Sequence, residues 1–150
     1  MSGTVAAAAK AKLVGTNNVL SGLSGLDGVV IGYCMPRDLP RECIYGGKVS
    51  GPVELAAFRG GGRVRRKEDL TLLLHIRVHD KGQPTPETVE ARAAEISTFV
   101  EEWIAANPTL GNLPDLKLAA VQAVELDSGL DDDSATAELT LTIGLMSFLT

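Results

Sequence analysis

The most regular alternation of apolar and polar residues lies between Asp69 and His79, and it predicts a long β-strand. One face of this strand is apolar and would belong to the core: Leu70, Leu72, Leu74, Ile76 and Val78. The other face is mixed and includes His75 and His79. A polar turn follows the strand at residues 80–83. This pattern indicates a strand whose second surface is covered by a helix or by a partner.

An amphipathic helix follows that turn. Thr85 is suited to cap the helix, Pro86 to be its first residue, and Glu87 to complement the dipole of its N-terminus. Apolar residues then recur at helical spacing in one stripe: Val89, Ala93, Ile96, Val100, Trp103 and Ile104. Asn107-Pro108 ends the helix, because a residue that precedes proline disfavours the helical conformation.

The C-terminal part of the chain predicts a β-hairpin. Apolar residues at 116, 118, 120, 124 and 126 alternate, with only Gln122 out of place, although Leu and Ala also favour helix. We favour a strand, because the alternating residues 139–149 supply its partner. The acidic segment 127–134 would be the turn. Gly144, inside the second strand, indicates a bulge or a close backbone contact.

The N-terminal third is less regular. Residues 1–24 contain a predicted helix from about Val5 to Leu20, ended by the Gly- and Ser-rich residues that follow. Val29 to Tyr33 predicts a short buried strand, and Glu42 to Val49 a second strand with a weak point at Gly46-Gly47. The least regular segment, residues 50–67, contains Arg59-Gly60-Gly61-Gly62-Arg63. We expect an exposed, mobile loop or hairpin tip there, since glycine is costly to order.

These elements predict one α+β domain over residues 1–150, with a mixed, mostly antiparallel β-sheet of four to five strands, two flanking α-helices and a C-terminal β-hairpin. Hydrophobic residues make up 45% of the chain but aromatic residues only 4%, so the core must consist of Leu, Val, Ile and Ala. The net charge of −5 argues against a protein that binds nucleic acid over its whole surface. Neither a targeting segment nor a membrane-spanning apolar run is expected.

No arrangement of side chains predicts catalysis, a metal site or a cofactor site. His75 and His79 would be roughly 13 Å apart on a strand, too far to share a metal ion whose ligands lie about 2 Å from it. We expect them to pair with a neighbour or to lie on a solvated face. The glycine run lacks the third glycine of a dinucleotide-binding loop, because Arg65 occupies its place. Cys34 and Cys43 are expected to be reduced and partly buried.

Two clusters of opposite charge are the candidate interaction residues. The basic cluster consists of Arg59, Arg63, Arg65, Arg66 and Lys67, and the acidic cluster of Asp131, Asp132 and Asp133. Each fits a solvated loop. The basic cluster also fits a patch that contacts the phosphate backbone of DNA or an acidic partner. The acidic turn lacks the closing glutamate of a calcium loop, and it would suit the basic cluster of an adjacent copy.

From Val29 to Leu149 the order of elements resembles the tail terminator proteins of long-tailed (siphovirus-type) bacteriophages. The resemblance rests on the charged start of the strand at Arg66-Lys67-Glu68-Asp69 and on the helix that begins at Thr85-Pro86 and contains Glu90-Ala91-Arg92. The segment Asn107-Pro108-Thr109-Leu110-Gly111 and the Asp-rich hairpin complete it.

This resemblance implies a structural protein of the virion that is not an enzyme and has no cofactor. Such proteins form homo-oligomeric rings, typically hexameric, at the head-proximal end of the tail after assembly in the host cytoplasm. They cap the tail tube protein, stop its polymerisation and provide the docking face for the head connector (stopper) protein. DNA passes through the ring, and no membrane is involved. The charged clusters would then lie at an interface between subunits or at the DNA channel.

Three other functions remain open from the sequence. The nearest is another head–tail joining protein, such as a tail completion or connector protein, which is also a small α+β domain. A small intracellular enzyme is a second alternative, and it would require an apolar pocket with convergent polar groups. A nucleic-acid-binding module is the third, and it would bind DNA with an affinity that falls steeply with salt.

Overall fold

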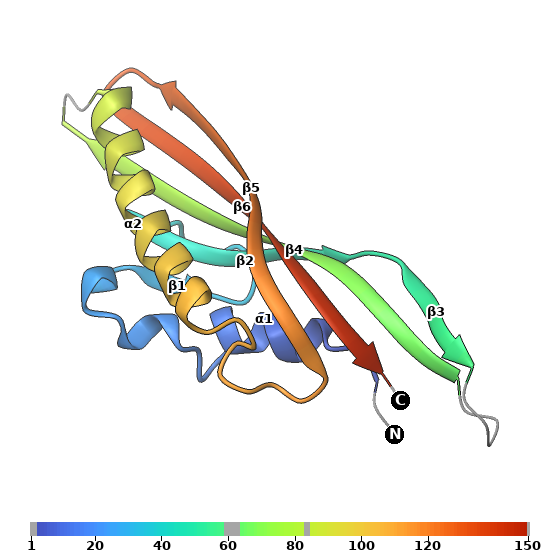
Figure 1. Ribbon diagram of the computed structural model, residues 1–150. Coiled ribbons are helices and arrows are strands. Elements are labelled where there is room, and N and C mark those ends of the chain that lie inside the picture. The colour runs from blue at the N-terminus through green and yellow to red at the C-terminus, as the bar shows by residue number, and fades with distance from the viewer. Residues whose placement is uncertain (1–2, 59–63, 83–84, 150) are drawn as a thin grey trace.

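Figure 1 shows the computed structural model of the chain, in which residues 3–58, 64–82 and 85–149 are described. The helices are α1 (Ala6–Val14) and α2 (Pro86–Ala106), with single 3-10 turns η1 (Leu20–Gly22) and η2 (Ser24–Leu26) after α1. The strands are β1 (Val30–Gly32), β2 (Glu42–Ser50), β3 (Val53–Phe58), β4 (Val64–Lys81), β5 (Leu116–Leu130) and β6 (Ser134–Leu149).

All six strands belong to one sheet in the order β1-β2-β4-β6-β5, and β3 also pairs with β4. Only the β1–β2 pair is parallel. Both helices contribute to one core on the same face of the sheet, α1 through Ala9 and Leu13 and α2 through Val100 and Ile104. The predicted α+β class, the mostly antiparallel mixed sheet and the C-terminal hairpin are therefore confirmed, with six strands in place of four to five.

The alternation in β4 sets the two faces of the sheet. The predicted core residues at positions 70, 72, 74, 76 and 78 are all buried, and the residues between them lie on the opposite face. β4 is longer than predicted and runs from Val64 to Lys81. β2 pairs with its second half, β3 with its first residues, and β6 with nearly its whole length on the other side.

The predicted helix start is confirmed in α2. Thr85 lies at the N-cap position, and its hydroxyl oxygen accepts a hydrogen bond from the backbone N–H of Thr88 at 3.2 Å. Pro86 is the first helical residue, and Ala106 is the last before Asn107. Most of the predicted apolar stripe is buried, and the partly buried Trp103 packs at its margin.

The first helix is shorter than predicted: it ends at Val14, although the apolar spacing continued to Leu20. At Gly15 the backbone N–H still donates to the carbonyl of Ala11 at 2.8 Å, but the chain then becomes extended. A side chain at position 15 would come within 2.5 Å of that carbonyl oxygen. The residues that follow, Thr16 to Asn18, are weak helix formers, so the spacing of two later apolar residues was not enough to prolong the helix.

The segment 50–67, predicted as an exposed, mobile loop or hairpin tip, is a β-hairpin over most of its described length. Val53 to Phe58 forms β3, which pairs antiparallel with the first residues of β4. This hairpin, which we call the arm, projects from the body of the molecule (Figure 1). The glycine run at residues 59–63, where the mobile tip was expected, lies outside the described residues.

The predicted single apolar face of the strand 116–126 is wrong, because two bulges shift the face. Leu116 and Ala119 face the core, and the register slips by one residue at Lys117. A second slip at Gln122 leaves Val124 on the helix-bearing face and Leu118 on the opposite face. Gln122 was the one residue out of phase with the alternation, because it is the extra residue of a bulge. β5 also continues to Leu130, so the acidic turn is shorter than predicted.

Candidate functional site

The described part of the basic cluster lies at the base of the arm. Arg66 is exposed and pairs in register with Leu55 of β3 and Leu149 of β6. The ammonium group of Lys67 lies 3.4 Å from the carboxylate of Asp69. Arg65 belongs to β4 by its backbone, and Arg59 and Arg63 lie outside the described residues. The described part of the cluster therefore lies on a projecting β-hairpin.

The acidic cluster forms the turn between β5 and β6. The backbone N–H of Asp131 donates to the carbonyl of Ser134 at 2.7 Å, which closes the turn. The side chain of Asp131 also accepts a bond from the N–H of Asp132 at 3.3 Å. Asp131, Asp132 and Asp133 are all exposed, so their charges are available to a partner.

The two clusters lie at opposite ends of the β4–β6 ladder. Arg66 pairs with Leu149 at one end, and Lys81 pairs with Ser134 at the other. The fifteen residue steps from Arg66 to Lys81 correspond to about 50 Å at roughly 3.3 Å per residue. At that separation the clusters cannot pair within one copy, and their attraction would be screened in physiological salt.

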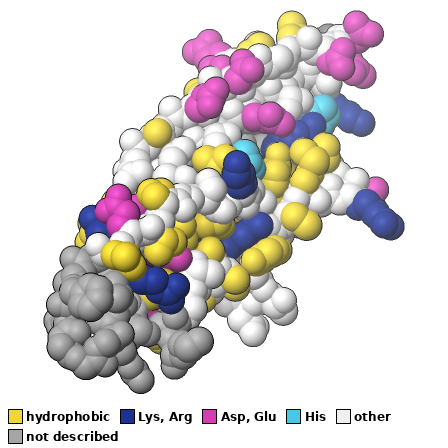
Figure 2. Space-filling model, turned by 90° about the vertical axis from the view of Figure 1, so that its right-hand side faces the viewer, with side chains coloured by type: hydrophobic (Ala, Val, Ile, Leu, Met, Phe, Trp, Pro, Cys, Tyr) yellow, Lys and Arg dark blue, Asp and Glu magenta, His cyan; other side chains and the backbone are white. Residues whose placement is uncertain are grey.

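His75 and His79 lie on the face of the sheet opposite the helices, each bonded to a threonine of β6. The His75 Nδ1 atom lies 3.1 Å from the hydroxyl oxygen of Thr140, and the His79 Nδ1 atom lies 2.7 Å from that of Thr136. The two imidazoles therefore have separate partners, as the sequence predicted. Figure 2 shows both on this face, where acidic side chains gather toward the upper end.

A charge pair lies between these two histidines. The Arg77 guanidinium is 3.8 Å from the carboxylate of Glu138. Burial lowers the pKa of His75, although the nearby Glu138 acts in the opposite direction. The ring of Tyr45 packs at 5.0 Å from the His75 imidazole. We call the cross-strand pairs His75–Thr140 and His79–Thr136 the histidine ladder. Because its pKa is lowered, the imidazole of His75 is mainly neutral at neutral pH.

Neither cysteine forms a disulfide. Cys34 is exposed, whereas Cys43 is fully buried, which differs from the expectation that both are partly buried. Burial raises the pKa of the Cys43 thiol, so it is protonated and a weak nucleophile at neutral pH. Within the described residues, no group of three or more His, Cys, Asp or Glu residues is placed to hold a metal ion.

Glu68 has a structural position that the sequence analysis missed. The residue is only 2% exposed, and its carboxylate accepts hydrogen bonds from the N–H of Val5 at 3.0 Å and from the hydroxyl of Ser147 at 3.4 Å. Val5 is the N-cap residue of α1, where a negative charge complements the helix dipole. The signal was present: Glu68 lies two residues before Leu70 and therefore in phase with the core residues of β4.

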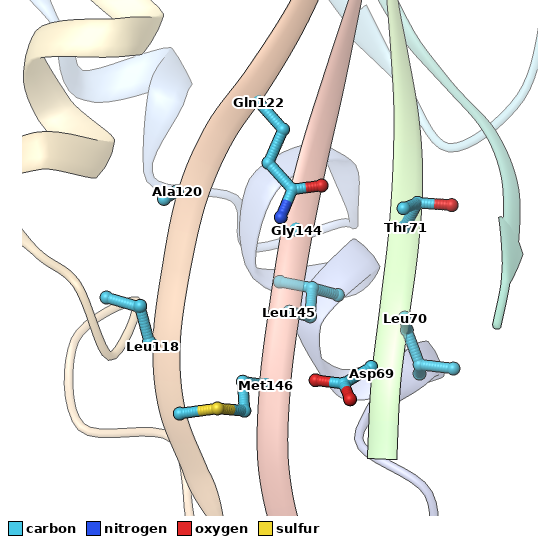
Figure 3. Close-up of a pocket in the computed structure, with 9 residues that line it drawn as sticks. All are labelled: Asp69, Leu70, Thr71, Leu118, Ala120, Gln122, Gly144, Leu145 and Met146. Carbon is cyan, nitrogen blue, oxygen red and sulfur yellow. The ribbon is translucent and has the colours of Figure 1, made fainter. Parts of the chain in front are cut away.

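An open groove of about 270 Å³ lies on the face opposite the helices, around Gly144 (Figure 3). Asp69 and Thr71 of β4, Gln122 of β5 and Met146 of β6 contribute to its lining. A side chain at position 144 would come within 2.2 Å of the Gln122 amide, so the glycine makes room for the bulged glutamine. The close contact predicted at Gly144 is therefore present. At this groove the side chain of Gln122 packs against the backbone of Gly144.

A second groove, of about 420 Å³, lies between the C-terminal end of α2 and the start of β5. Its lining is mostly apolar and includes Ile104, Ala105, Pro108 and Val121, with Glu101 as the charged member. Further along β5, three apolar side chains on the helix-bearing face are exposed: Val124 by 53%, Leu126 by 42% and Leu130 by 67%. The edge strand is thus unusually apolar for a surface in contact with water.

The chain matches no model of a known protein family, and the search of curated proteins found no match to it either. No helix in the described ranges has the length and apolar character needed to span a membrane.

Proposed function

We propose that this chain is a structural virion protein: a tail terminator that forms a ring at the head-proximal end of a phage tail. The ring would cap the tail tube, stop its polymerisation and present a docking face to the head connector. The proposal begins from the resemblance in the order of elements, and the architecture supports it with two helices on one side of a long, mostly antiparallel sheet.

The observation that carries the proposal is the separation of the basic and acidic clusters by about 50 Å along one sheet. A closed ring is built from head-to-tail contacts, in which one face of each subunit meets a different face of the next. Opposite charges at the two ends of each subunit would be brought together by such a contact. They would also fix the orientation of neighbouring subunits.

The test replaces Arg63, Arg65 and Arg66 with Glu and assembles tails with the variant in place of the wild-type chain. We expect a folded variant that does not cap the tube, because the reversed charges repel the acidic turn of the neighbouring copy. Electron microscopy would then show overlong tubes. The control replaces Arg37, Lys48 and Lys117 with Glu, which makes the same change in net charge at exposed positions outside both the arm and the acidic turn.

The appearance of the particles distinguishes this function from the nearest alternative. If the variant gives separate heads and tails of normal length, the chain acts as a connector or completion protein. Tails of normal length that join heads and remain infectious would refute a role of the arm in capping.

A further inference from the structure

β3 and β5 are edge strands on opposite sides of the sheet. β3 pairs only with β4, and β5 pairs only with β6, among the strands of the described residues. The loop after α2 covers the start of β5, where the carbonyl of Pro108 accepts a bond from the N–H of Ala119 at 2.6 Å. Beyond that point, residues 121–130 have one edge without a strand beside it in the described structure. Exposed edges of this kind are templates for pairing with another chain.

Both edge strands expose apolar side chains on the same face of the sheet. Val53 of β3 is 51% exposed and Leu55 is 72% exposed. Leu55 pairs in register with Arg66, which pairs with the buried Leu149, so Leu55 lies on the helix-bearing face. Val124 and Leu126 of β5 lie on that face too, since they pair with the buried Leu141 and Leu139.

We propose that β3 of one copy adds to the free edge of β5 in the next copy, so that the sheet continues from subunit to subunit. Val53 and Leu55 would then pack beside Val124 and Leu126. The inference rests on the proposed ring and names the contact that closes it. The second copy is the occupant because the arm supplies both a free strand edge and an exposed apolar pair.

The directions of the strands agree with this pairing. β3 is antiparallel to β4, β4 to β6 and β6 to β5, so β3 runs opposite to β5 within one copy. Two copies placed side by side in the same orientation would therefore form an antiparallel pair, with both apolar rows on one face. The six residues of β3 span about 20 Å, and the free segment 121–130 spans about 33 Å, so the donor strand fits.

The charges near the two strands are complementary. Glu101 lines the groove beside β5, Glu90 accepts a hydrogen bond from Ser128 at 2.6 Å, and Glu125 and Asp127 are exposed on β5 itself. The arm that carries β3 is basic by sequence, with arginines at 59, 63, 65 and 66 and a lysine at 67. Attraction between the two would orient the strands before they pair.

The test compares a donor variant, Leu55→Asp, with an acceptor variant, Leu126→Lys, by sedimentation of the purified full-length chain. Each places a charge in the proposed contact, and each sign repels the charges facing it. We expect the wild type to self-associate and each variant to associate at least tenfold more weakly. The controls Met35→Asp and Leu39→Lys make the same changes at exposed apolar positions outside both strands, and they should behave as the wild type.

A mixture of the two variants gives the sharper test. The intact β3 of the Leu126→Lys chain can still pair with the intact β5 of the Leu55→Asp chain. At the other two edges the introduced carboxylate and the introduced ammonium group would lie side by side, and their opposite charges attract. An equimolar mixture should therefore associate at least tenfold more strongly than either variant alone. Circular dichroism spectra equal to that of the wild type would show that each variant is folded.

Other outcomes would overturn the pairing. If the wild type and both variants associate equally, the ring uses another contact. The capping role is then tested separately, by the length of the tails in electron microscopy. If the wild type remains monomeric at the highest soluble concentration, or the mixture associates no more strongly than either variant alone, the occupant of β5 is not β3 of a second copy. Neither result alters the tail-length experiment, so the two proposals fail separately.

Discussion

Glu68 occupies a position at which the alternation of β4 would place an apolar side chain. It instead supplies a buried acceptor for the backbone of Val5 and the hydroxyl of Ser147. Ser147 interrupts the apolar row of β6 in the same way, and it is fully buried. The two polar residues thus satisfy one another across the sheet and attach the start of α1, since buried polar groups require partners.

Replacing Glu68 with Ala should therefore lower the free energy of unfolding by about 2 kcal/mol, because two buried donors lose their acceptor. Urea denaturation followed by circular dichroism measures this change. Glu102→Ala is the matched control: Glu102 is exposed on α2, and its loss should change stability by no more than about 0.5 kcal/mol. Equal effects of the two substitutions would show that the Glu68 contacts add no stability.

The histidine ladder predicts how stability depends on pH. Because burial lowers the pKa of His75 in the folded protein, the unfolded chain binds the proton more readily, and stability is lost as pH falls through and below about 6.5. Urea denaturation between pH 7.5 and 5.5 should show this decrease in the wild type and a smaller decrease in His75→Gln. Identical pH dependence in both proteins would contradict this explanation.

At the scale of the elements, the sequence predicted helices and strands most accurately where a single local pattern, such as alternation or a capping residue, determines the element. The period of β4 identified its core face, and the Thr85-Pro86 start identified α2. The weak point at Gly46-Gly47 is an irregularity in the pairing of β2, between Gly46 and Val49. These features depend on local chemistry, which is visible in a short window of residues.

The elements that were missed depend on contacts distant in sequence. The arm forms because β3 pairs with the start of β4, and the sequence, with three consecutive glycines, allowed a loop or a hairpin tip but gave no sign of this pairing. The bulges of β5 depend on its register against β6, so the broken alternation at Gln122 had no explanation before the pairing was known. The candidate surfaces were therefore only half predicted: the charges were identified, but the strand edges and the apolar rows beside them were not.

The N-cap of α2 gives a prediction at the same scale. Thr85→Ala removes the hydroxyl that accepts from the N–H of Thr88, and it should lower the free energy of unfolding by about 1 kcal/mol. Thr98→Ala serves as the control, because Thr98 is exposed in the middle of the same helix and bonds only to the carbonyl of Ala94. Both variants can be measured by thermal or urea unfolding. A loss at Thr98 as large as at Thr85 would contradict the capping role.

At the scale of the whole molecule, the chain is asymmetric. One side of the sheet carries the helices, while the opposite side carries the histidine ladder (Figure 2). The basic arm and the acidic turn lie at opposite ends, and the two free edges lie on opposite sides. Two rigid copies related by a two-fold axis cannot pair β3 with β5 twice, because these edges lie on opposite sides of the sheet, so pairing of both edges favours assemblies in which every subunit repeats the same directional contact.

β4 has a mechanical consequence for such an assembly. Its 18 residues, about 60 Å at roughly 3.3 Å per residue, run without interruption from the arm to the acidic turn, with hydrogen-bonded strands along both sides. A rod held in this way resists bending. A load applied to the arm by one neighbour would be transmitted to the far end as a tilt of the whole subunit, so every member of a closed circle would have to tilt together.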